Sequence, residues 1–437
     1  MLVKGGETTP RHPQGKITID EQAKTFSAGW QYLTESLHFC YTILHEIFAG
    51  SGMTALSKAY GDRTVDGQAI SVEFVVSESA TAARNGAGFH PCQGLYFSPK
   101  NQPVRTAFIA AHYNVDFSEH YLAPLMAARG FGFLGWNTRF RGNEGFFLLE
   151  HALIDLGAGV RWLREHAAIE QVVILGNSGG GSLMAAYQSQ SHGVTMHATP
   201  GLNLPSALGD LPSADFYISL CAHQGRPEVL TDWFDPAITD ETDPISVDPQ
   251  LDMYNPANGP AYSAEFIQRY RQAQVDRNHR ITDWCHSELQ RLESQGYRDR
   301  AFNLYRTWAD LRLLDGTIDP SKRIIGRCYA GDPKTANYSP RGIGLTNTLR
   351  TWLSMWSLRD SCCRGAEHLS RIREPALVIQ SDADTGVFPS DAQTIFDGIA
   401  ATDKTLHMIS GDHYLQDPGD ARTLAADLIS EWLGKRL

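Results

Sequence analysis

The feature that most constrains the fold is an alternation of short apolar runs with helical stretches between about residues 70 and 225. Runs such as VVIL and FIAA are apolar without polar interruption, which is typical of strands covered on both faces. The segments 119–129 and 152–166 between them have helical character. This order predicts a mostly parallel sheet joined by crossover helices. The predicted strands are 69–77, 93–98, 106–113, 130–137, 171–177 and 215–222.

The alternation stops after residue 225 for about 140 residues and resumes with predicted strands at 375–382 and 405–410. The simplest description is an α/β core with helices on both faces of its sheet, interrupted by a largely helical cap. The predicted parts are an N-terminal helical extension (1–65), two core segments (66–225 and 366–437) and an inserted cap or lid (226–365). The extension could cover the core, join the cap or form a homodimer contact.

Composition excludes several classes of function. The 437 residues are 42% apolar and 20% charged, as in ordinary globular proteins. A net charge of −11 argues against nucleic-acid and acidic-membrane partners, which require a positive surface. Because no stretch reaches about 18 apolar residues and the N-terminus lacks the apolar segment of a signal peptide, we expect a cytoplasmic protein. A small-molecule substrate remains the expected partner.

Seven scattered cysteines lack the paired spacing of a zinc site or a disulfide framework. Buried free thiols explain them most simply, although the neighbours Cys362 and Cys363 leave a redox role open. The acidic run 240–243 lacks the spacing of an EF-hand. We therefore expect no metal and no cofactor.

A possible nucleophile lies where the run 171–177 meets a helical stretch. Residues 176–180 read Gly-Asn-Ser-Gly-Gly, which matches G-x-S-x-G at a strand-to-helix turn. Such a turn projects Ser178 above the sheet, and the amide of Gly179 at the helix start can donate to a developing oxyanion. A phosphate-binding loop is the alternative, but the chain lacks Gly-Lys-Ser/Thr and G-x-G-x-x-G.

A serine nucleophile needs a base and a carboxylate that orients it. Two aspartates, Asp382 and Asp384, follow the predicted strand 375–382, and His413 follows the strand 405–410. Both segments should open at the carboxyl edge of the sheet, beside Ser178. His407 lies within its strand, where packing is the simpler role.

Here the chain resembles the α/β-hydrolase fold superfamily, over roughly residues 65–225 and 370–437. Its acid loop commonly reads glycine-x-x-Asp-x-x-x-x-Pro, which residues 381–389 match with Ser381 in place of the glycine. The resemblance implies a catalytic triad of Ser178, Asp384 and His413, with Asp382 as the reserve acid. It implies an enzyme of the serine esterase or lipase kind.

The resemblance also implies a second oxyanion donor after the third core strand, where the family usually has His-Gly-x. This chain reads Ala-His-Tyr-Asn at 111–114, so tyrosine replaces the glycine. The donor would be the amide of Tyr113 or Asn114, and the Tyr113 hydroxyl could instead reach the oxyanion or only line the pocket. Arg139 and Arg141 match a family segment that fixes this loop.

The cap is rich in aromatic residues, which supply apolar contact area to a ligand. We expect at least half of them to form the core of the cap itself. Trp233, Trp284 and the loop residue His112 are the predicted substrate contacts. The sequence thus predicts cleavage of a carboxylic ester or lactone of a fairly bulky apolar substrate. The alternatives are thioester hydrolysis, acyl transfer, carbon–carbon bond hydrolysis or a non-catalytic ligand-binding protein on the same fold.

Overall fold

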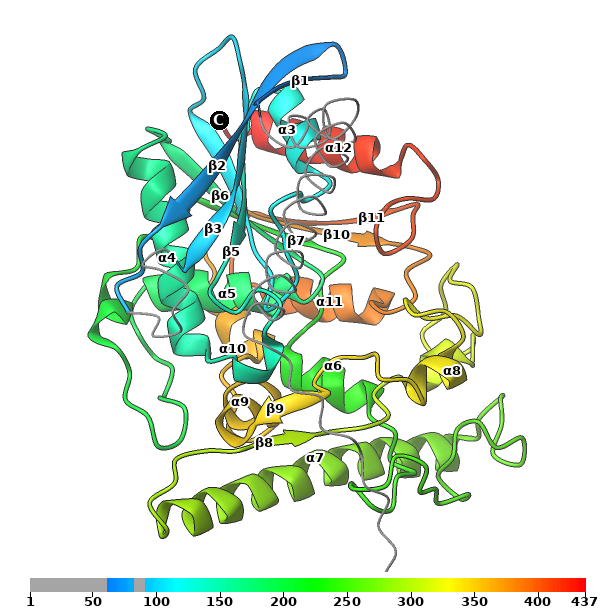
Figure 1. Ribbon diagram of the computed structural model, residues 1–437. Helices are drawn as coiled ribbons and strands as arrows, with labels where there is room; N and C mark the ends of the chain where they lie inside the picture. The colour runs from blue at the N-terminus through cyan, green and yellow to red at the C-terminus, as the bar shows by residue number, and fades with distance from the viewer. Residues whose placement is uncertain (1–60, 82–90) are drawn as a thin grey trace, which may run out of the picture. The chain divides into compact units, whose positions relative to one another are not determined.

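A central nine-stranded sheet organises the protein in the computed structural model, which describes residues 61–81 and 91–437 (Figure 1). Asp62–Leu437 forms one compact unit. The strands are β1 (Gly61–Val65), β2 (Gln68–Ser77), β3 (Cys92–Pro99), β4 (Thr106–Ala110), β5 (Gly132–Asn137), β6 (Gln171–Asn177), β7 (Phe216–Leu220), β10 (Ala376–Ser381) and β11 (Lys404–Ile409).

The strand order is β1-β2-β3-β5-β4-β6-β7-β10-β11. β2 and β5 both pair antiparallel with β3, and every pairing from β5 through β11 is parallel. The mostly parallel sheet predicted from the sequence is therefore confirmed. Parallel strands end at the same edge, so the segments that follow β4, β6, β7, β10 and β11 come together there.

The N-terminal extension predicted for residues 1–65 lies outside the described residues up to residue 60. Its last five residues correct the prediction, because Gly61–Val65 is strand β1 at the edge of the sheet. Asp66 and Gly67 connect β1 to β2 with φ of 50° and 76°. An Asp-Gly pair adopts such positive φ values readily, which explains the tight connection.

Helices cover both faces of the sheet, as predicted. α3 (Ala123–Ala128) and α12 (Ala421–Gly434) pack on one face, and four helices pack on the other (Figure 1). The four are α4 (Leu149–Glu165), α5 (Gly180–Ser191), α10 (Gly365–Leu369) and α11 (Pro389–Gly398). Short 3-10 turns are η2 (Glu144–Phe146) and η3 (Ser206–Asp210).

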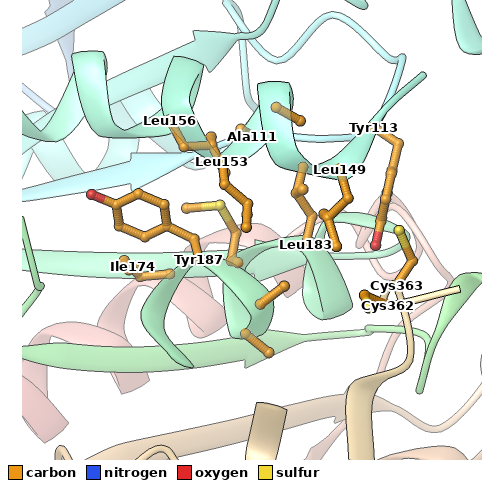
Figure 2. Close-up of a cluster of buried hydrophobic side chains, with 14 of the residues drawn as sticks. Ala111, Tyr113, Leu149, Leu153, Leu156, Ile174, Leu183, Tyr187, Cys362 and Cys363 are labelled. Carbon is orange, nitrogen blue, oxygen red and sulfur yellow. The ribbon is translucent and has the colours of Figure 1, made fainter. Parts of the chain in front are cut away.

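The uninterrupted apolar strands feed two separate cores. In β4, Ala107 and Ile109 belong to the core under α4 and α5, whereas Phe108 and Ala110 belong to the core under α3 and α12. Figure 2 shows part of the first core, in which Ile174 of β6 lies near Tyr187 of α5. Burial on both faces fixes β6 and α5 firmly, and the turn between them carries Ser178.

Residues 226–365 lie between β7 and β10 and add no strand to the main sheet. The segment contains the 30-residue helix α7, several short helices and a two-stranded β8–β9 pair, joined by long stretches of turns and loops. Its elements are α6 (Arg226–Trp233), α7 (Ala264–Glu293), β8 (Ala301–Asn303), η4 (Leu311–Leu313), α8 (Pro333–Asn337), β9 (Thr346–Thr348), α9 (Leu349–Thr351) and the π-helical turn η5 (Trp352–Trp356).

Six cysteines fall within residues 61–81 and 91–437, and all six are buried and unpaired. No helix in that part of the chain is both long and apolar enough to cross a membrane. Nor does it contain a group of three or more His, Cys, Asp or Glu side chains arranged to hold a metal ion.

Candidate active site

Ser178 lies in the sharp turn between β6 and α5 and has a φ of 55°. A positive φ is strained for a residue with a side chain, so the surrounding contacts must hold it. The Ser178 amide donates to Leu220 O at 3.2 Å, and its carbonyl accepts from Gly181 N at 3.1 Å and His223 N at 3.0 Å. These bonds pin the turn to the end of β7.

Glycines make room for this turn. A Cβ on Gly176 would lie 2.7 Å from the Cα of Gly181, and one on Gly180 would lie 2.3 Å from the carbonyl oxygen of Ala111. Both obstacles are backbone atoms that cannot move without disturbing the sheet. The glycines of the G-x-S-x-G pattern are therefore required by close packing of the backbone.

A chain of hydrogen bonds connects three of the predicted site residues. The Ser178 Oγ lies 3.0 Å from His413 Nε2, and His413 Nδ1 lies 2.7 Å from Asp384 Oδ2. Asp384 and His413 are buried, with 1% and 4% of their surface exposed. The other oxygen of Asp384 accepts from the amides of Gly386 and Val387 at 2.9 and 3.0 Å, so the carboxylate is fixed from both sides.

The reserve acid and the second histidine are directed elsewhere. Asp382 forms an ion pair with Lys322 at 2.7 Å and makes no hydrogen bond with His413. His407 lies inside β11, in register with Ile379 of β10. Of the two aspartates in the loop, the structure brings Asp384 to the histidine.

Two backbone amides, one in the serine turn and one in the loop after β4, have no partner in the part of the chain that the structure describes. The Gly179 and Tyr113 amides donate no hydrogen bond within the described residues, whereas the Asn114 amide donates to His112 Nδ1 at 3.4 Å. The Tyr113 hydroxyl is buried and bonded to Ser182 Oγ at 3.0 Å, which directs it into the protein core. Of the three candidates for the second oxyanion donor, this geometry favours the Tyr113 amide. It argues against the Tyr113 hydroxyl, which is already bonded inside the core.

The insertion contributes Tyr329, a residue that the sequence analysis missed. Its hydroxyl donates to Asp384 Oδ1 at 3.1 Å and lies 2.9 Å from His413 Nδ1, while its ring stacks on the imidazole at 4.3 Å. Burial raises the pKa of Tyr329 well above its usual value, so the hydroxyl stays protonated. A Cβ on Gly386 would lie 2.1 Å from this hydroxyl. Gly386 is the one signal in the sequence that another residue packs closely against the acid loop, but it does not reveal that this residue is Tyr329.

Two further donor side chains lie beside Gly179. A Cβ on Gly179 would lie 2.6 Å from His112 Nε2 and 2.7 Å from Arg226 Nη1. Burial, and then the positive charge of Arg226, lower the pKa of His112 well below its usual value. Because His112 Nδ1 accepts from the amides of Asn114 and Val115, the neutral ring carries its proton on Nε2.

Arg226 was not predicted, and its guanidinium is held on three sides. Nη2 donates to Glu144 Oε1 at 2.8 Å, and the other oxygen of Glu144 accepts from Gly344 N at 3.0 Å. The guanidinium lies 4.6 Å from the ring centre of Tyr113 and 4.8 Å from that of Trp356. Arg226 is 2% exposed, so this arrangement fixes a buried cation next to the serine turn.

The two arginines expected to fix the loop after β5 both pair with aspartates. Arg139 binds Asp155 through Nε and Nη2 at 2.8 and 2.7 Å. Arg141 reaches Asp116 at 3.0 Å. Neither residue contacts Ser178, His413 or Asp384.

The two tryptophans predicted to contact substrate have different surroundings. Trp233 is 4% exposed and packs against Trp308, Tyr329 and His223, so its ring supports the site from beneath. Trp284 is 40% exposed and packs edge-on against Phe302. Aromatic content alone could not reveal which helix face each ring occupies.

A half-open cavity of about 260 Å³ adjoins the site beside His223 and Gly386. Its lining is mixed, with Val229, Val275 and Leu358 next to several charged side chains. Burial raises the pKa of the cavity carboxyls Glu228 and Asp391. The rest of the lining consists of Gln224, Thr231, Asp232 and Arg312.

The mostly parallel sheet, the serine at a strand-to-helix turn and the chain order Ser178, Asp384, His413 are those of the α/β-hydrolase fold. No known family profile and no curated protein matches the sequence.

Several solved structures are similar at low identity. The esterase domain of a Rhodothermus marinus protein is 12% identical and covers 83% of this chain and 97% of its own, with a TM-score of 0.40. DcsB, solved with a substrate analogue, is 12% identical over 84% of this chain and 100% of its own, with a TM-score of 0.47. The α/β hydrolase GrgF from Penicillium sp. sh18 is 9% identical over 82% and 96%, with a TM-score of 0.45.

Proposed function

We propose that this protein is a serine hydrolase that cleaves a carboxylic ester or lactone through an acyl-enzyme. The observation that carries the proposal is the hydrogen-bonded chain from Ser178 through His413 to Asp384, with the serine held at a φ of 55°. A non-catalytic binding protein would have no need of all three groups in this order.

In the proposed reaction, His413 Nε2 takes the hydroxyl proton as Ser178 Oγ attacks the acyl carbonyl. Asp384 keeps the imidazole in the orientation that receives this proton and stabilises the imidazolium. The amides of Gly179 and Tyr113 stabilise the oxyanion of the tetrahedral intermediate. His413 then gives the proton to the leaving alcohol, and the same steps with water release the acid.

We also propose that residues 226–365 act as a cap over the triad. The support is Tyr329, which belongs to this segment and contacts both Asp384 and His413. A cap in contact with the acid and base would exclude water and limit which substrates enter. The aromatic cluster around Trp233 and the apolar part of the cavity lining are consistent with a fairly bulky substrate.

A fluorophosphonate probe tests the proposed nucleophile. We expect it to label Ser178 in the wild type and to label nothing in Ser178→Ala, since that change removes the attacking oxygen. The free energy of unfolding of the variant should lie within about 1 kcal/mol of the wild-type value, because the change removes only one half-buried hydroxyl at a turn. The same variant should no longer hydrolyse p-nitrophenyl esters of graded chain length. Labelling at another residue would contradict the assignment.

A further inference from the structure

The surroundings of Gly179, next to Ser178, carry more hydrogen-bond donors than an oxyanion requires. Besides the amides of Gly179 and Tyr113, two side-chain donors converge on Gly179, His112 Nε2 and Arg226 Nη1. Each lies within 2.7 Å of the point where a Gly179 Cβ would be. The glycine therefore leaves a space between them that a larger residue would fill.

Neither of these donors is used by the protein. His112 Nε2 and Arg226 Nη1 make no hydrogen bond within the described residues, and neither is sealed from solvent. Arg226 Nε is buried and also lacks a partner. Glu144, the carboxylate that pairs with the guanidinium, is already bonded at both oxygens, to Arg226 Nη2 and to Gly344 N.

The chemistry of these donors selects an anion. A guanidinium and an imidazole N–H donate hydrogen bonds and accept none in this arrangement, so the complementary ligand atom is a negatively charged oxygen. The rings of Tyr113 and Trp356 hold the guanidinium plane, so little freedom is lost on binding.

The position of His413 indicates which part of the substrate carries the anion. His413 must protonate the leaving alcohol, so the leaving group lies on its side of Ser178. The space next to Gly179, where the free backbone amide lies, is then assigned to the acyl group. Building on the proposed hydrolase function, we propose that Arg226 and His112 bind a carboxylate on the acyl part of the substrate, so that the natural substrates are half-esters of dicarboxylic acids or lactones bearing a carboxylate.

The test compares p-nitrophenyl half-esters of succinate, glutarate and adipate with the neutral butanoate, pentanoate and hexanoate esters of equal length, with spontaneous hydrolysis subtracted. We expect the wild type to favour at least one half-ester over its neutral partner by tenfold or more in kcat/KM, the range for a hydrogen bond to a charged group. Equal or lower kcat/KM for all three half-esters overturns the proposal.

Arg226→Lys keeps the charge but loses the planar fork, so we expect it to reduce this ratio by about tenfold. Arg161→Lys is the matched control, because Arg161 pairs with Asp210 on the surface, and it should keep the wild-type ratio. If Arg226→Lys slows the half-ester and the neutral ester equally, the arginine serves the oxyanion or the scaffold, and the proposal is wrong.

A measurement on the wild type covers the case in which the variant does not fold. Succinate, glutarate or adipate should protect Ser178 from the fluorophosphonate at a concentration at least tenfold lower than butanoate, pentanoate or hexanoate. Equal protection overturns the carboxylate site while leaving the hydrolase function intact. Absence of labelling at Ser178 would instead refute the hydrolase function itself.

Discussion

At the scale of single residues, Asp384 and Asp382 differ by two positions but have different environments. Asp384 accepts from His413, whereas Asp382 pairs with Lys322. Asp384→Asn should keep the loop but hold the wrong imidazole tautomer, costing on the order of 10⁴-fold in kcat. Asp382→Asn is the matched control and should cost less than about tenfold, since it removes a surface pair. Steady-state kinetics on one ester separates the two, and the opposite ranking would make Asp382 the acid.

Tyr329 contacts Asp384 and His413, the proposed acid and base. Tyr329→Phe keeps the ring on His413 but removes the hydroxyl that donates to Asp384. We expect kcat to fall by about tenfold with KM nearly unchanged, because a hydrogen bond to a charged group is lost. Steady-state kinetics on one ester measures this change, and an unchanged kcat would mean that the hydroxyl is dispensable.

At the scale of elements, the cluster beneath Tyr329 joins the insertion to the site. Trp233 on α6 is stacked on Trp308 at 4.6 Å and touches Tyr329 edge-on. Trp233→Ala should lower the free energy of unfolding by about 3–5 kcal/mol, since a large buried ring is removed. It should also reduce kcat/KM by the same factor for all esters in a series, because the support for Tyr329 is lost.

Trp284→Ala on the exposed side of α7 is the matched control and should change kcat/KM by less than about twofold. Urea unfolding and an ester series measure both effects. Loss restricted to particular acyl groups after Trp233→Ala would instead mean that this ring touches substrate.

The sequence predicted the strands and helices of the core because their signal is local. Each strand is a short apolar run, and Ser178, Asp384 and His413 each follow one of these runs at the same edge. Tyr329 and Arg226 have no such signal, because they reach the site only through the folding of the insertion. Tyr329 lies 55 positions before Asp384 and 84 positions before His413 in the sequence. Local periodicity carries no information about such contacts.

At the scale of the whole molecule, buried neutral histidines connect stability to pH. Burial lowers the pKa of His120 to about 4, and it lowers the pKa of His112 and His223 as well. The unfolded chain binds protons near pH 6.5, so it takes up more protons than the folded state between pH 6.5 and 4. The free energy of unfolding should therefore fall as the pH falls through this window, by about 3 kcal/mol for His120 alone.

Urea unfolding at pH 7, 6 and 5 measures this loss. His120→Gln can keep a donor for Asn177 and does not titrate, so it should flatten the pH dependence. His166→Gln, at an exposed position, is the matched control and should leave the slope as in the wild type. A slope unaffected by His120→Gln would show that this histidine does not contribute.

The two ends of the insertion meet where it leaves the core. Gly225 forms an antiparallel bridge with Arg364, and the Arg226 amide donates to Cys363 O at 3.1 Å. Gly365 is needed there, because a Cβ would lie 1.8 Å from the carbonyl oxygen of Gln224. The two ends of the insertion are therefore adjacent where the chain leaves the core and returns to it. Its length and sequence can change during evolution without altering the distance that the sheet must span, so selection can adjust access to Ser178 while the strands remain as they are.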